Sequence, residues 1–120
     1  MQFWKASLER PHKILFIKYE DLKKDIVFEM KKLAEFLGFP FSEEEEKRGL
    51  VEKIAEFCGI ENMKRLKGNT EGKRPSGALN RSYFRKGEVG DWMNFLTPSM
   101  VERMRKLVQE KFEESGLKIF

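Results

Sequence analysis

Hydrophobic residues recur every three or four positions in two segments near the middle of the chain, which is the spacing of one face of an α-helix. The first segment begins after Asp25 and ends at Gly38, a residue type that commonly terminates helices. In the second segment, Ser42 is a residue type that caps helix N-termini. Glu45, three residues later, is the residue type that completes a capping box with it. The apolar face of this second segment continues to Gly59. The pattern predicts a helix in each segment.

A further helix is predicted near the end of the sequence. Thr97 is a suitable N-cap, and Pro98 suits the first helical position because its missing N–H has no partner there. Gly116 closes the segment. Its apolar residues are predicted to form one buried stripe: Met100, Val101, Met104, Leu107, Val108 and Phe112. We interpret the methionines as core fillers rather than as a ligand surface.

One segment has the pattern of a buried strand. Residues 14–17 read Ile-Leu-Phe-Ile between Lys13 and Lys18, without alternation, as in a strand covered on both faces of a parallel sheet. A lone parallel strand needs neighbours. It therefore pairs with another chain, or the other strands lie outside this sequence. We predict a mostly helical chain with one short strand.

Composition narrows the class of protein. A length of 120 residues allows at most one small domain, and 40% hydrophobic residues with 11 Phe indicate a buried core. The net charge of +4 favours anionic partners but does not choose between phosphates, nucleic acid and acidic lipid. The single Cys58 excludes an internal disulfide framework and suits a reducing compartment. No run approaches the ~18 apolar residues of a membrane span, so we predict a cytoplasmic protein without membrane association.

Residues 60–90 are rich in glycine, asparagine and basic residues, and we predict a long loop there. The basic residues from position 64 to 87 are Lys64, Arg65, Lys67, Lys73, Arg74, Arg81, Arg85 and Lys86. A loop of this length in a compact domain is usually functional or disordered. A nucleic-acid module is one alternative, but the loop has only Tyr83 and Phe84 as aromatic residues and no recognition motif. We therefore predict no nucleic-acid partner.

The run from Arg85 to Trp92, Arg-Lys-Gly-Glu-Val-Gly-Asp-Trp, carries the clearest chemistry. A guanidinium can bind two oxygens of a phosphate through its fork, and the adjacent ammonium of Lys86 adds a point charge. Glycines that follow allow the backbone N–H groups to approach an anion. The run predicts a phosphate site. The plainer alternative is an ordinary basic loop with a glycine turn and a buried Trp92.

No catalytic constellation is visible in the sequence. His12 is the only histidine, and no nucleophile-elbow sequence is present to make a Ser-His-Asp arrangement with it. One Cys and one His cannot form a structural zinc site, so we predict no metal. We assign no catalytic residue.

The Arg-Lys-Gly run resembles the C-terminal signature of the cytosolic sulfotransferases, which use 3′-phosphoadenosine 5′-phosphosulfate (PAPS). Residues 11–22 and 33–38 also resemble segments of this family in the same order, and residues 96–100 are most similar to plant members. The resemblance implies a P-loop-like α/β parent fold, of which this chain is the mostly α C-terminal part. It further implies that residues 1–120 form a partial sulfotransferase domain, with the loop that binds the donor's 3′-phosphate around residues 81–92.

The resemblance also implies a set of donor-binding residues. They are Arg85, Lys86 and Gly87 at the 3′-phosphate, Phe84 near the nucleotide, Tyr19 at the adenine end, and Cys58 and Ile60 in the adenine pocket. Ile60 replaces the family's usual Phe, and Gly59 its commoner Ser. Trp92 is implied to be structural, packing the loop after the motif.

The implied activity is transfer of a sulfuryl group from PAPS to a hydroxyl of a small molecule such as a flavonoid, steroid, jasmonate or desulfoglucosinolate. The family's Lys-Ser-Gly-Thr-Thr-Trp loop and its catalytic His are absent from this sequence. We therefore expect the chain to be the final third of a sulfotransferase that carries the 3′-phosphate site and is inactive alone. The alternative is a truncated gene product that acts as a weak nucleotide-binding or interaction module.

Self-association is predicted to be absent. Many animal sulfotransferases dimerise through Lys-x-x-x-Thr-Val-x-x-x-Glu just after the Arg-Lys-Gly motif. The same register here gives Met93, Thr97, Pro98 and Glu102, so two of the four positions differ. The resemblance therefore implies a monomer.

Overall fold

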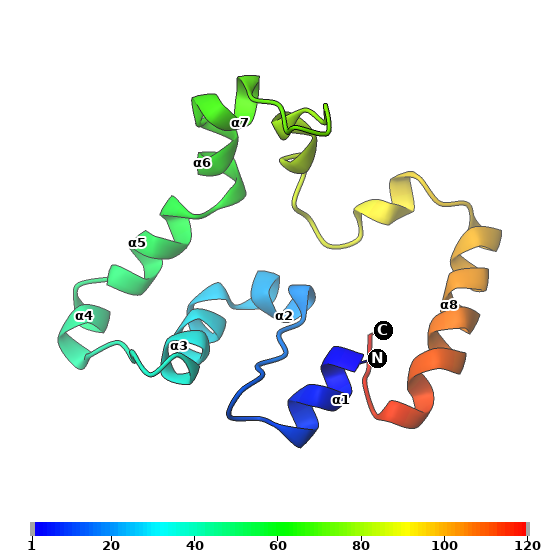
Figure 1. Ribbon diagram of the computed structural model, residues 1–120, viewed down its shortest axis with the longest axis horizontal. Helices are drawn as coiled ribbons and strands as arrows, with labels where there is room; N and C mark the ends of the chain where they lie inside the picture. Colours follow the sequence, from blue (N-terminus) through cyan, green and yellow to red (C-terminus); the bar gives the residue numbers. More distant parts are fainter. Residues whose placement is uncertain (1, 120) are drawn as a thin grey trace. The chain divides into compact units, whose positions relative to one another are not determined.

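The computed structural model describes residues 2–119 and divides them into two compact units (Figure 1). The central unit comprises residues 19–89. The terminal unit comprises residues 2–18 together with residues 90–119. Both are built from helices joined by turns, as the periodicity predicted, and the two units are described separately below.

The central unit contains six α-helices and one 3-10 turn. They are α2 (Tyr19–Lys24), α3 (Ile26–Phe36), α4 (Glu43–Lys47), α5 (Leu50–Phe57), α6 (Ile60–Arg65), α7 (Lys67–Glu71) and η1 (Asn80–Tyr83). The predicted start of α3 is confirmed, because the Asp25 carboxylate accepts the Phe28 N–H at 3.0 Å. Helix α3 packs against α5 and α2. The core of this unit lies there, with Val51 only 1% exposed.

The predicted capping box is confirmed at the start of α4. The Ser42 hydroxyl accepts the Glu45 N–H at 3.2 Å, and the Glu45 carboxylate accepts the Ser42 N–H at 2.8 Å. The prediction of one continuous helix from here to Gly59 was wrong, because α4 ends at Lys47 and α5 begins at Leu50. Between them Gly49 has a φ of +70°, which no right-handed helix accommodates.

The region predicted as one long loop contains two short helices, α6 and α7. Side-chain amides hold this region together: Asn69 donates to the Met63 carbonyl at 2.8 Å, and Asn80 donates to the Gly68 carbonyl at 2.8 Å. These bonds compensate for weak apolar periodicity, which is why the hydrophobic pattern did not reveal the helices. The prediction of a loop was therefore wrong for residues 60–71.

The terminal unit contains α1 (Gln2–Glu9), η2 (Asp91–Asn94), α8 (Pro98–Phe112) and η3 (Glu113–Ser115). In Figure 1, α1 lies beside the segment that follows α8. The indole N–H of Trp4 donates to the Ser115 carbonyl at 2.8 Å, and the Lys18 ammonium donates to the Lys118 carbonyl at 3.3 Å. These bonds join the two sequence segments of the unit.

No strand forms over residues 14–17, and in the described part of the chain the β-pairing is an isolated antiparallel bridge between Lys73 and Leu79. The predicted strand is therefore wrong for this structure. A β-ladder needs a second backbone alongside, which no described segment supplies to these residues. Their side chains are half-buried instead, and the Phe16 ring meets the Trp4 ring edge-on at 5.3 Å between centroids.

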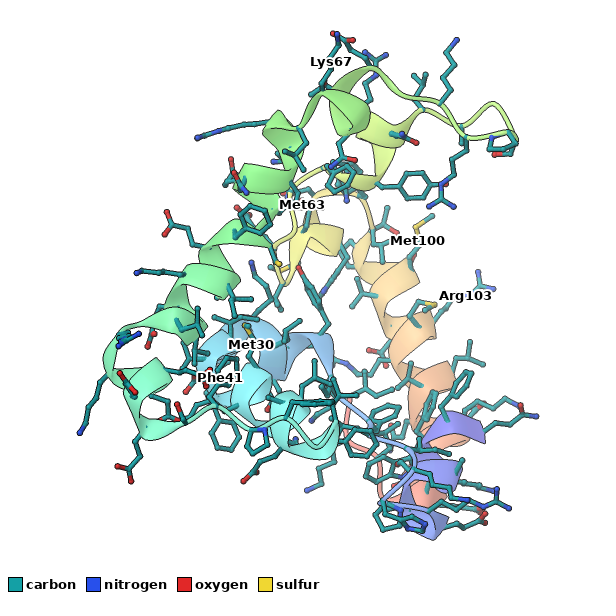
Figure 2. All side chains as sticks on the ribbon, turned by 60° about the vertical axis from the view of Figure 1, so that its left-hand side comes forward. Met30, Phe41, Met63, Lys67, Met100 and Arg103 are labelled. Carbon is teal, nitrogen blue, oxygen red and sulfur yellow. The ribbon has the colours of Figure 1, made fainter. Side chains whose placement is uncertain are left out.

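Helix α8 begins as predicted, with the Thr97 hydroxyl accepting the Met100 N–H at 3.4 Å. The predicted buried stripe is only partly correct. Val101, Val108 and Phe112 are half-buried. By contrast, Met100, Met104 and Leu107 are 49%, 49% and 48% exposed, and Figure 2 shows Met100 and Arg103 along α8. Periodicity identifies an apolar face, but only a neighbouring element can bury it.

Few apolar side chains are buried in the described part of the chain, contrary to the core expected from composition. The buried ones are Val51 and Leu117, whereas Phe39, Phe3 and Phe57 are 82%, 78% and 70% exposed. Burying one such side chain stabilises a fold by about 1.5–3 kcal/mol. Exposed apolar side chains in this number indicate surfaces suited to contact further protein.

Candidate functional site

The residues predicted to bind phosphate follow η1 in the central unit, and residues 84–89 are called the basic loop below. Phe84 is half-buried, and its N–H donates to the Arg81 carbonyl at 3.2 Å. The side chains of Arg85 and Lys86 are exposed, so an anion in solvent can reach both. Gly87 is half-buried and has a φ of +65°. Glycine adopts this left-handed conformation without steric cost.

The basic loop lies directly against the first residue of α6. A Cβ added to Gly87 would lie 2.6 Å from Cδ1 and 3.3 Å from Cγ2 of Ile60. Real Cβ atoms essentially never approach other atoms within 3.0 Å. The structure therefore brings together Gly87 and Ile60, which the family resemblance implies contact the donor's phosphate and its adenine respectively. With Ile60 in its observed position, their contact leaves no room for a side chain at residue 87.

The corner between α5 and α6 holds Cys58 and Ile60. Cys58 caps the C-terminus of α5, with its N–H donating to the Ile54 carbonyl at 2.9 Å, and it is exposed. The Asn62 side-chain amide donates to the Phe57 carbonyl at 2.6 Å across the corner. This bond links α6 to the end of α5, two residues from Ile60.

A cavity of about 670 Å³ opens at the same corner. Its lining comprises Lys23, Lys53, Glu56, Phe57, Gly59, Ile60, Glu61, Asn62 and Arg65. Three cations and two acids share the lining, so an anion meets both attraction and repulsion there. Ile60 lines the cavity, while Cys58 does not, nor does Tyr19, which is 47% exposed at the first position of α2.

Several residues that make contacts within the α5–η1 region, before the basic loop, were not identified as important from the sequence. Asn62, Asn69 and Asn80 each donate a side-chain hydrogen bond to a backbone carbonyl of the α5–η1 region. Asparagine in glycine-rich segments commonly bonds to nearby backbone, and this was the available signal. The Arg74 guanidinium stacks over the Tyr83 ring at 4.7 Å, one residue before Phe84.

Trp92 belongs to the terminal unit, so the Arg-Lys-Gly-Glu-Val-Gly-Asp-Trp run crosses the boundary between the two units at Gly90. Trp92 lies in η2, where its carbonyl accepts the Leu96 N–H at 2.9 Å. It is 42% exposed, so the plainer interpretation, with a buried Trp92, does not hold for its side chain.

The described residues were also compared with the requirements of a metal site and of a membrane-spanning helix. No group of three or more His, Cys, Asp or Glu side chains is placed to hold a metal ion within residues 2–119. In the same part of the chain, the helices are all too short or too polar to cross a membrane.

Comparisons with known proteins agree in family. Residues 1–116 match the model of the sulfotransferase domain. Cytosolic sulfotransferase 14 of Arabidopsis thaliana is 54% identical over 115 residues, which are 96% of this chain and 33% of that protein. Flavonol 4′-sulfotransferase of Flaveria chlorifolia is 50% identical over 119 residues, covering 96% of this chain and 37% of that protein.

The chain is also similar to a solved structure. Mouse sulfotransferase SULT7A1 complexed with PAP superposes with a TM-score of 0.68 at 31% identity, covering 92% of this chain and 38% of that one. The chain spans about a third of the length of the curated relatives above. Its mostly α structure is thus part of the α/β fold of those larger proteins, and the chain belongs to the sulfotransferase family, with plant cytosolic members among its relatives.

Proposed function

We propose that the basic loop and the α5–α6 corner bind the donor nucleotide of a PAPS-dependent sulfotransferase. The observation that carries this proposal is the contact of Gly87 with Ile60. It places the basic loop, which is expected to bind the phosphate, against the residue expected to contact the adenine. The PAP named in the SULT7A1 complex supports the choice of nucleotide. The proposed reaction of the whole protein is transfer of a sulfuryl group from PAPS to a hydroxyl of a small molecule.

In this proposal each residue of the site binds or positions the nucleotide. The Arg85 fork accommodates two oxygens of the 3′-phosphate, and Lys86 adds a second positive charge. Gly87 allows the backbone N–H groups of the loop to approach the anion. Phe84, Tyr19, Cys58 and Ile60 contact the nucleoside. PAPS supplies the reactive sulfuryl group when bound, and remote contacts of this kind accelerate transfer by orienting it.

We propose that the chemistry itself depends on protein outside this chain. The sequence contains no Lys-Ser-Gly-Thr-Thr-Trp loop, and its only histidine is the exposed His12. The exposed apolar side chains of both units are where the remainder of a sulfotransferase domain would pack. The names of the plant relatives favour a flavonol or another plant hydroxyl compound as acceptor and the cytosol as location.

Replacing Arg85 with Ala tests the phosphate assignment. Calorimetric titration with 3′,5′-adenosine bisphosphate is expected to show affinity about 10–100-fold weaker, because charge-assisted hydrogen bonds to phosphate contribute about 1.5–3 kcal/mol. The affinity of Arg85→Lys should lie between those of wild type and Arg85→Ala, since lysine keeps the positive charge but cannot bind two oxygens through a guanidinium fork. Arg48→Ala is the matched control, because Arg48 is an exposed arginine at the C-cap of α4, paired with Glu44. Equal heats for wild type and Arg85→Ala would remove the assignment.

The isolated 120-residue chain is expected not to turn over PAPS. The purified chain is assayed for 3′,5′-adenosine bisphosphate release with a phenol, a flavonol and a steroid, beside a heat-inactivated sample. No release above that sample is expected, because the chain lacks the groups that act on sulfur. Detectable turnover would show that the chemistry resides in these residues. Nucleotide binding without turnover is expected both from the proposed donor site and from the alternative of a nucleotide-binding module.

A further inference from the structure

Residues 73–79 form a solvent-exposed hairpin turn in the central unit. Lys73 and Leu79 form an antiparallel bridge, and the Arg74 N–H donates to the Ala78 carbonyl at 2.9 Å. At the tip, the Gly77 N–H donates to the Arg74 carbonyl at 2.8 Å, which closes a β-turn with Pro75 and Ser76 at its two central positions. All residues from 73 to 77 are exposed. The Ser76 hydroxyl therefore lies at the tip of a projecting turn.

The charges around Ser76 distinguish it from the other serines of the chain. Lys73 lies three positions before it and Arg74 two positions before it. None of the other serines, Ser7, Ser42, Ser82, Ser99 and Ser115, has basic residues at both positions. Ser7 has Lys5 two positions before it but Trp4 three positions before it. Protein kinases choose substrates largely through charge patterns of this kind, and those with acidic substrate grooves select serines preceded by two cations. Ser82, preceded by Arg81 alone, offers an internal comparison.

We propose that Ser76 is a phosphorylation site for a serine/threonine kinase with an acidic substrate groove. The donor is MgATP. The Ser76 oxygen attacks the γ-phosphorus of ATP. The bond between that phosphorus and the oxygen it shares with the β-phosphate breaks, and ADP leaves. The Ser76 hydroxyl proton passes to the catalytic carboxylate of the kinase. The product carries a phosphate at the tip of the turn, close in sequence to both cations that direct the kinase.

The modification has a structural consequence at Arg74. In the unmodified chain its guanidinium stacks on the Tyr83 ring at 4.7 Å. A phosphoserine two residues away presents three strong acceptor oxygens, which bind a guanidinium more strongly than an exposed aromatic ring does. Phosphorylation therefore draws Arg74 from Tyr83, the residue just before Phe84. This consequence does not depend on the chain binding a nucleotide.

The test is phosphorylation of the full 120-residue chain in vitro. The chain is incubated with MgATP and the catalytic subunit of a kinase that selects serines preceded by two basic residues, and the intact mass and peptide masses are followed with time. A gain of about 80 Da on Ser76 is expected, with none on Ser82. The gain should vanish in Ser76→Ala. In Lys73→Gln and Arg74→Gln, the initial rate should fall at least about tenfold, because each loses a charge-assisted contact to the kinase.

Tyr83→Leu tests whether the kinase depends on the two cations or on the contact between Arg74 and Tyr83. The variant removes the ring under Arg74 and keeps both cations. This variant should be phosphorylated at least as fast as wild type. In proton NMR spectra, the Arg74 side-chain signals of the phosphorylated chain should match those of phosphorylated Tyr83→Leu, because in both the guanidinium contacts the phosphate and no longer the ring. Modification of Ser82 in place of Ser76, or equal rates for Arg74→Gln and wild type, would overturn the proposed site. Unmoved Arg74 signals after full modification would overturn its structural consequence.

Discussion

Replacing Gly87 with Ala is expected to destabilise the central unit by about 2–5 kcal/mol, because two costs act at one residue. Gly87 has a φ of +65°, where a side chain is strained by about 1–2 kcal/mol. The new Cβ would also lie 2.6 Å from Cδ1 of Ile60, so the Ile60 side chain, the loop or the start of α6 must move. Urea-induced unfolding of the full chain, followed by circular dichroism, measures the change in free energy of unfolding.

Gly77→Ala is the matched control for this experiment. Gly77 has a φ of +86°, but no atom lies within 4 Å of an added Cβ, so the control carries the backbone strain without the collision. The difference between the two variants isolates the contact with Ile60. Combining Gly87→Ala with Ile60→Ala should recover about 1–3 kcal/mol relative to the sum of the single changes. Equal losses for Gly87→Ala and Gly77→Ala would show that the basic loop does not lie on α6.

Replacing Gly72 with Ala is expected to release the hairpin turn from α7 and to cost about 2–4 kcal/mol. An added Cβ would lie well under 3.0 Å from both the Asn80 side-chain amide and the Gly68 carbonyl oxygen. Those two atoms form the 2.8 Å hydrogen bond that anchors Asn80, so the collision breaks an existing contact. The Asn80 N–H, which donates to the Gly72 carbonyl at 2.9 Å, should lose protection from hydrogen exchange.

Gly68→Ala is a comparison variant for which we expect the free energy of unfolding to change in the opposite direction. Gly68 lies inside α7, and the space around an added Cβ is empty within 4 Å. Alanine at a helical position is more favourable than glycine by up to about 1 kcal/mol, so this variant should be slightly more stable than wild type. A gain in stability from Gly72→Ala, or a loss from Gly68→Ala as large as that of Gly72→Ala, would contradict the packing described for this turn.

The helix starts were predictable because capping is local. Asp25, Ser42 and Thr97 each bond a backbone N–H three residues ahead, and the residues involved are adjacent in the sequence. The break between α4 and α5 was missed because the cap at Ser42 and the apolar face that starts at Leu50 were read as one helix. Residues 43–49 contain no apolar residue to mark the break, and Gly49 adopts a positive φ there. Helices α6 and α7 were missed because the asparagine side chains that bond backbone carbonyls around them act across several residues.

Burial was the least predictable property. The apolar faces of α8 and of residues 14–17 were recognised, yet Met100, Met104 and Leu107 are half-exposed and no strand forms. Periodicity shows that a face can be buried, while a neighbouring element decides whether it is. The central unit supplies that neighbour only around Val51, where α5 packs on α3.

The sequence by itself determined which residues could bind a phosphate and where most of the helices begin. Charge, side-chain chemistry and capping belong to a residue and its near neighbours, so Arg85, Lys86 and the N-caps could be identified without a fold. Only the tertiary structure decided that Gly87 rests on Ile60, that Arg74 stacks on Tyr83, and that an asparagine holds the α5–α6 corner. These contacts depend on the conformation of the backbone between the residues, which their spacing in the sequence does not determine.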